Sequence, residues 1–136
     1  MKTLVIFYSY AGHTKKLAER IAAEQSAELL EVLDARRPGI IRAFFSGCPK
    51  AMKGDGWPIK DFDTDIAAAE RVILVFPTWA SSLPPAANEL ISRLPSGKAV
   101  EVIMNSGGGE SKCRERVQNM LAAVGCTLAK FEDVKA

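Results

Sequence analysis

The chain has 136 residues, of which 48% are hydrophobic and 25% charged, so the composition predicts one globular domain over residues 1–136 and excludes a disordered protein. The net charge of +2 arises from basic residues scattered along the chain, which gives no case for a nucleic-acid or a membrane partner. Three widely spaced cysteines form neither a disulfide framework nor a C-x-x-C motif, and no signal peptide is recognisable, so we expect a cytoplasmic protein.

The first part of the chain alternates between a strand pattern and a helix pattern. Residues 3–8 form an apolar, β-branched run that suits a strand buried on both faces. A helix is expected to begin near Gly12, and a weaker strand pattern follows at residues 28–33. One face of this helix carries the apolar residues Leu17, Ala18, Ile21 and Ala22.

Residues 34–65 interrupt the alternation, because prolines and glycines recur through them. Apolar residues at helical spacing still predict one short helix and a further turn through Met52: Ile40, Ile41, Phe44, Phe45 and Cys48. We expect Phe44, Phe45 and Trp57 to pack on the sheet, although covering a ligand or meeting a second subunit are alternatives. The role of the insert at residues 38–58 is left open.

The second part of the chain returns to alternating strands and helices. Strands are predicted at residues 72–76, 100–104 and 127–131, the last with a weaker pattern. A helix begins at Pro85, with Ala86, Ala87, Leu90, Ile91 and Leu94 on its inner face. Another is lined by Cys113, Val117, Met120, Leu121 and Val124 and is stopped by Gly125. This order predicts an α/β fold with a doubly wound, five-stranded parallel sheet.

Three loops follow predicted strands at the carboxyl edge of this sheet, where open α/β sheets bind ligands. The first loop, residues 9–14, combines two hydroxyls and a glycine at a helix N-terminus, which suits a phosphate, although an ordinary capped turn is equally consistent. The second loop, residues 77–85, places Trp79 where it can stack on a planar ring or join the core, and the core is favoured when this loop is taken alone. The third loop, residues 105–111, contains three glycines.

Convergence of these loops predicts a nucleotide site, although the sequence contains none of the other nucleotide-binding or catalytic motifs that we checked. Neither G-x-x-x-x-G-K-[ST] nor G-x-G-x-x-G is present, and no Ser-His-Asp constellation is visible, so no catalytic residue is assigned. The lone His13 has no second histidine or cysteine cluster near it, so a metal site is not expected and His13 is expected at the surface.

The three loops resemble those of the flavodoxin family. The sequence YSYAGHT at residues 8–14 is similar to the flavodoxin phosphate loop, residues 77–79 with 83–85 resemble the second flavin loop, and residues 106–109 resemble the third. The insert also resembles a segment of short flavodoxin-like proteins, at residues 44–47 and 51–54. The resemblance spans essentially the whole chain and implies a sheet order of 2-1-3-4-5 and one bound flavin mononucleotide (FMN).

The resemblance also implies which residues bind FMN. Those expected at the phosphate are Ser9, Gly12 and Thr14, with the backbone of Tyr10, Ala11 and His13. Those expected beside the isoalloxazine are Trp79 with its neighbours Pro77, Thr78, Ala80 and Ser81. Those expected at its pyrimidine end are Ser106, Gly107, Gly108 and Gly109.

Two departures from the family pattern bear on the chemistry. Ala11 stands where the family usually has threonine, and losing one hydroxyl donor weakens phosphate binding by about 1–2 kcal/mol. Residues 78–82 contain no glycine, whereas flavodoxins often flip a peptide beside the ring during one-electron reduction. The sequence therefore mildly favours two-electron chemistry.

These observations leave open whether the chain is an enzyme. The resemblance implies a flavodoxin that transfers electrons to or from a redox partner protein, although such flavodoxins are commonly acidic and this chain is not. The alternative is an NAD(P)H-dependent, FMN-containing reductase of quinones or similar acceptors, with a nicotinamide donor. A flavodoxin-like interaction module without flavin is the third possibility, and monomer and homodimer are both open.

Overall fold

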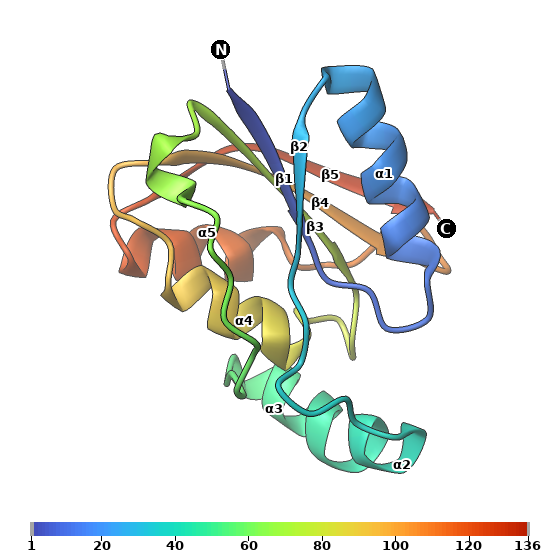
Figure 1. Cartoon of the computed structure of the whole chain (residues 1–136). Coiled ribbons are helices and arrows are strands. Elements are labelled where there is room, and N and C mark those ends of the chain that lie inside the picture. The colour runs from blue at the N-terminus through green and yellow to red at the C-terminus, as the bar shows by residue number, and fades with distance from the viewer. Residues whose placement is uncertain (1, 136) are drawn as a thin grey trace.

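The computed structural model describes residues 2–135 and shows a five-stranded parallel sheet with helices on both faces (Figure 1). The strands are β1 (Thr3–Phe7), β2 (Glu28–Glu31), β3 (Arg71–Pro77), β4 (Ala99–Ser106) and β5 (Thr127–Lys135). Their order in the sheet is β2-β1-β3-β4-β5, and every neighbouring pair is parallel. The predicted fold class and the implied strand order are both confirmed.

Three helices make the crossovers between parallel strands. Helix α1 (His13–Gln25) lies on one face of the sheet, and α4 (Pro85–Ser92) and α5 (Arg114–Ala123) lie on the other (Figure 1). A 3₁₀ turn, η2 (Ile66–Ala68), precedes β3. Each crossover helix lies where the apolar periodicity predicts it, because each buries the stripe that the sequence shows.

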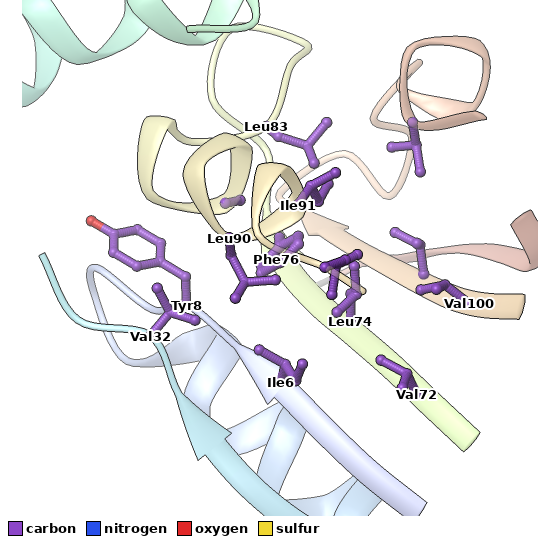
Figure 2. Packing of buried hydrophobic residues seen from close by; sticks show 14 of the residues in the cluster. Ile6, Tyr8, Val32, Val72, Leu74, Phe76, Leu83, Leu90, Ile91 and Val100 are labelled. Atoms are coloured by element: carbon purple, nitrogen blue, oxygen red, sulfur yellow. The ribbon is translucent and has the colours of Figure 1, made fainter. Parts of the chain in front are cut away.

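Alternate residues of the central strands face opposite layers. Ile6 and Leu74 point towards α4 and α5 and form part of the core in Figure 2, whereas Val5 and Ile73 pack with α1. Full burial of each such side chain contributes about 1.5–3 kcal/mol. A slip of one residue would exchange the two faces, so this alternation specifies the register strongly.

The strands at one side of the sheet are longer than predicted. Strand β5 continues to Lys135 instead of residue 131, and β4 continues to Ser106 instead of residue 104. The added residues of β5 are mostly exposed, because an edge strand pairs on one side only and needs no apolar run. Periodicity alone therefore places the ends of these strands too early.

The insert forms a helical run that lies at one end of the molecule, below α4 in Figure 1. The run consists of α2 (Ile40–Arg42), the π-helical turn η1 (Ala43–Gly47) and α3 (Cys48–Lys53), and the backbone remains helical at both junctions. Trp57 belongs to the main hydrophobic core, as predicted. The prediction that Phe44 and Phe45 pack on the sheet is wrong, because both side chains are exposed.

Candidate functional site

A cleft of about 220 Å³ lies beyond the carboxyl ends of β1, β3 and β4. Its lining residues come from all three loops: Tyr10, Ala11, His13, Thr14, Pro77, Thr78, Trp79, Asn105, Ser106 and Gly107. Nine of these ten were predicted from the sequence, and Asn105 was not. The loops meet because parallel strands all end at the same edge of a sheet.

The N-terminus of α1 opens at this cleft without the partners that a helix start usually has. Gly12 is the N-cap residue, with φ of 99°, and no side chain caps the first turn. No acidic residue lies in that turn, and the basic residues Lys15 and Lys16 are part of it. The unpaired N–H groups and the positive end of the helix dipole therefore favour an anion here.

The two hydroxyls of the first loop are engaged within the protein. The Ser9 Oγ accepts a hydrogen bond from the Gly12 N–H at 3.0 Å, and the Thr14 Oγ1 donates to the Asn105 Oδ1 at 2.7 Å. Ser9 does not line the cleft. In this geometry the Thr14 hydroxyl proton is taken by Asn105, whereas the Ser9 Oγ only accepts and keeps its O–H as a donor. The backbone N–H groups of the first turn of α1 are further donors for an anion.

Asn105 connects all three loops. It is the last residue but one of β4, its side chain is buried, and its Oδ1 holds Thr14 of the first loop. Its carbonyl accepts hydrogen bonds from both the N–H and the Oγ1 of Thr78 in the second loop, at 3.0 and 3.1 Å. The signal in the sequence is a polar residue that follows an apolar strand pattern, two positions before the first glycine of the third loop.

The second loop contains a tight turn without glycine. Trp79 and Ser82 exchange two backbone hydrogen bonds, of 2.9 and 3.0 Å. Ala80 and Ser81, the two central residues, both have positive φ angles, of 51° and 55°. Hairpin turns of this kind favour Asn and Gly, because left-handed backbone costs other residues about 1–2 kcal/mol each. The turn therefore holds strain next to the cleft, as functional loops often do.

The Trp79 ring is held by three other aromatic rings. The edges and faces of Tyr8, Tyr10 and Trp57 contact it at centroid distances of 6.1, 5.8 and 6.3 Å. Tyr8 Oη and Trp57 Nε1 in turn donate to the buried Asp34 carboxylate, at 2.7 and 2.8 Å. Burial, together with the hydrogen bond to Asp34, raises the pKa of Tyr8 far above its ordinary value. These contacts fix the orientation of Trp79 towards the cleft.

The third loop brings an unpaired polar atom to the cleft. The Ser106 Oγ is buried and has no hydrogen-bond partner among residues 2–135, which is unusual for a buried hydroxyl. A Cβ at Gly107 or Gly108 would meet no atom within 4 Å, so a ligand can approach the backbone of this loop. Gly109 has a different role, because its positive φ of 78° and its close packing on Lys135 both require glycine.

An apolar cleft of about 300 Å³ adjoins the first one. It is lined by Tyr10, Ile40, Ala43, Phe44, Cys48, Thr78, Trp79 and Ala80. Tyr10, Thr78 and Trp79 line both clefts, so the two clefts share a wall between the strand ends and the insert. The remaining predicted site residues line neither cleft: Ser9, Gly12, Ser81, Gly108 and Gly109.

Comparison with known proteins matches residues 1–130 to the family described as NADPH-dependent FMN reductase. An uncharacterized protein of Archaeoglobus fulgidus is 28% identical over 107 residues, which are 78% of this chain. The match covers 66% of that relative, so this chain spans just under two thirds of its length.

Solved structures share the fold at lower sequence identity. A flavoprotein from Lactobacillus acidophilus in complex with FMN superposes with a TM-score of 0.81 and 21% identity, over 96% of this chain and 91% of that one. A short-chain flavodoxin associated with a bacterial microcompartment gives a TM-score of 0.56 and 15% identity, over 99% of this chain and 86% of that one. At these identities the likeness shows the fold alone.

Proposed function

Because the chain belongs to the family of NADPH-dependent FMN reductases, a flavodoxin-like family that binds FMN, we propose that it transfers electrons through one FMN held by the three loops. One observation carries the proposal: the first turn of α1, which has no side-chain cap, and Ser106, whose buried Oγ has no partner among the described residues, line the same cleft. The first suits a phosphate, and the second suits a ligand with hydrogen-bonding groups at its other end. FMN has both.

The phosphate would rest on the first loop and the first turn of α1. The proposed donors are the backbone N–H groups of Tyr10, Ala11, His13 and Thr14, since the Gly12 N–H donates to the Ser9 Oγ and the Thr14 hydroxyl donates to Asn105. Lys15 and Lys16 add positive charge to the same helix turn. Ala11 supplies no hydroxyl, so the backbone carries more of the binding than the flavodoxin pattern implies.

The ring would lie between the second and third loops. Trp79 offers an aromatic surface whose orientation is fixed by its neighbours, and Ser106 with the Gly107 backbone offers polar contacts at the opposite end. When bound, FMN supplies the redox chemistry of the protein. The chain's own contribution is to orient the ring and to exclude water from its buried side.

A reductase that uses a nicotinamide donor and an organic acceptor is the second candidate function. The apolar cleft beside Trp79 and Phe44 supports it, because a flat apolar acceptor or the donor's nicotinamide would fit next to the ring. The turn at Ala80 and Ser81 supports it too. Its two hydrogen bonds hold the peptide beside the ring in place, and no glycine is present to ease a peptide flip. Because such a flip accompanies one-electron reduction in flavodoxins, a fixed peptide suits two-electron transfer.

A flavin titration tests the proposal. We expect the purified protein to quench FMN fluorescence at micromolar concentration and to retain a yellow absorbance after gel filtration. Gly107→Val should abolish this binding, since its side chain would enter the cleft from a position that is now open. Gly39→Val is the matched control, because it also has open space but lies in the insert outside both clefts. Failure of the unmodified protein to bind FMN would leave a flavin-free interaction module.

A nicotinamide oxidation assay separates the two functions. The FMN-loaded protein is mixed with NADPH and a water-soluble quinone, and absorbance at the nicotinamide band is followed. Rapid oxidation by the protein alone identifies a reductase. A flavin that stays oxidised under these conditions, yet is reduced by a separate reductase protein, identifies an electron carrier.

A further inference from the structure

The insert helix, defined as residues 40–53, carries its large apolar side chains on the face that points to solvent. The residues that face the body are small: Gly47 lies so close to Trp79 that a Cβ would be 2.7 Å from its ring, and Ala51 is fully buried. The large apolar residues face outward, with exposed fractions of 56–79%: Ile40, Ile41, Phe44, Phe45 and Met52. A surface helix normally buries its large apolar stripe and exposes polar residues.

The exposed apolar face extends well beyond the cleft. Ile40 and Phe44 line the apolar cleft, so part of their surface belongs to the site already described. Ile41, Phe45 and Met52 do not line it. Their spacing of four and seven residues places them along one side of the helix, and we call these three residues the outer stripe. A contiguous exposed apolar surface of this kind marks an interaction site.

Positive charge is concentrated on the insert helix and the four residues before it. Residues 36–53 contain five of the 18 basic residues of the chain and none of its 16 acidic residues. The rest of the chain therefore has a net charge of −3, although the whole has +2. All five basic side chains are exposed: Arg36, Arg37, Arg42, Lys50 and Lys53.

We propose that the insert helix docks on the surface of an anionic lipid bilayer. Bulky apolar side chains that project from a helix enter the boundary between headgroups and acyl chains, while flanking basic residues meet anionic headgroups. No helix in residues 2–135 combines the length and the apolar content needed to span a bilayer, so the contact is a peripheral one. From the sequence we expected no membrane partner, because the basic residues are scattered along the chain. The structure adds the exposure of Phe44 and Phe45, which were expected to pack on the sheet.

A second copy of the chain fits this surface less well. A symmetric contact through the outer stripe would bring the five basic residues of each copy close to the same five of the other, with no acidic residue in either segment. Arg37 and Arg42 contact the rings of Tyr10 and Trp57, which leaves Arg36, Lys50 and Lys53 to meet an anionic surface. Each basic residue near such a surface is worth about fivefold in binding.

The docked orientation would also place the apolar cleft at the bilayer, since Ile40 and Phe44 belong to both the cleft and the exposed face. Lipophilic quinones dissolve in bilayers, so such an acceptor could reach the ring without crossing water. This last step rests on the proposed function, whereas the docking itself does not.

Vesicle co-sedimentation of the full chain loaded with FMN tests the docking. We expect binding to vesicles of phosphatidylcholine with phosphatidylglycerol, little binding to phosphatidylcholine alone, and weakening by salt. Phe45→Ser, outside the cleft, should lower the partition coefficient about tenfold, and Lys50→Gln with Lys53→Gln should lower it by about fivefold for each charge. Leu29→Ser and Lys130→Gln, at exposed positions on β2 and β5, are the matched controls and should change nothing.

Three results would overturn the proposal. One is no binding to the anionic vesicles, and another is equal loss in the variants and their controls. The third is a dimer in analytical ultracentrifugation that Phe45→Ser dissociates, without vesicle binding, which would identify a second copy as the occupant. FMN absorbance measured in the same samples reports the proposed function separately, so failure of one does not imply failure of the other.

Discussion

Thr14 and Asn105 are separated by 91 positions in the chain and are joined by a buried hydrogen bond of 2.7 Å between the Thr14 Oγ1 and the Asn105 Oδ1. The bond links the start of α1 to the end of β4, and the Asn105 carbonyl links both to Thr78. Asn105 therefore joins the three loops to one another through one side-chain acceptor and one carbonyl.

Replacing Thr14 by valine should weaken both folding and FMN binding. Thr14→Val keeps the shape of the side chain but leaves the buried Asn105 Oδ1 without its donor, which costs about 1–3 kcal/mol. We expect a lower urea midpoint and a higher Kd for FMN, measured by fluorescence quenching. Thr78→Val is the matched control for the urea midpoint, because the Asn105 carbonyl keeps the Thr78 N–H. Equal effects of the two substitutions would contradict the role of the Thr14 contact.

Introducing glycine into the second loop should stabilise the protein. Ser81→Gly removes the steric cost of a φ angle of 55°, with an expected gain of up to about 1 kcal/mol after the entropy of glycine is deducted. Chemical denaturation should show this as a higher midpoint with an unchanged slope. Ala122→Gly, within α5, is the control, because glycine inside a helix should lower the free energy of unfolding by about 1 kcal/mol. A destabilised Ser81→Gly variant would show that the turn holds no relievable strain.

Adding a methyl group at Gly47 should displace the insert helix from Trp79. The new Cβ would lie 2.7 Å from Trp79 Cζ3 and 3.2 Å from Trp57 Cη2, and such overpacking costs about 1–3 kcal/mol. We expect a lower Tm, altered near-ultraviolet circular dichroism and weaker FMN binding for Gly47→Ala. Gly39→Ala, where a Cβ has open space and φ is −70°, should leave all three measurements unchanged. If Gly47→Ala behaves in the same way, the helix is not packed on Trp79 as described.

The ion pair between Arg71 and Glu101 should make stability depend on acid pH. Hydrogen bonds from the Arg71 guanidinium hold the pKa of the Glu101 carboxyl below its usual 4.5 in the folded state. Its contribution is therefore present above pH 4.5 and is lost as the pH falls through the lowered folded pKa. Glu101→Gln should cost about 1 kcal/mol at pH 7, and its difference from the unmodified protein should disappear in acid.

The control for this pair is Glu89→Gln, which removes an ion pair with Arg93 on the surface of α4. That substitution should have a smaller effect at pH 7, because both partners are more exposed than Glu101. Urea unfolding of the three proteins between pH 3 and pH 7 measures the difference. A Glu101→Gln deficit that persists unchanged at the lowest pH would contradict the assignment.

Apolar periodicity was enough to predict the sheet, its crossover helices and the convergence of three loops. Such patterns are local, and a parallel sheet places all strand ends at one edge whatever the details of packing. The ends of β4 and β5 were predicted less well, because Asn105 and the polar residues after Phe131 carry no periodic signal. Asn105 itself was missed because its importance depends on Thr14 and Thr78, which only folding brings to it.

The sequence by itself determined the α/β class and most of the residues that line the cleft, since both follow from short-range patterns and from where strands end. Only the tertiary structure decided which groups are paired and which are exposed. The Thr14 hydroxyl has a partner, the Ser106 hydroxyl has none among the described residues, and the large side chains of the insert face solvent. The physical reason is that hydrogen-bond pairing and burial are relations between distant residues. Gly47 and Trp79 illustrate it, because only a residue without a side chain at position 47 lets the insert helix pack this closely on the Trp79 ring.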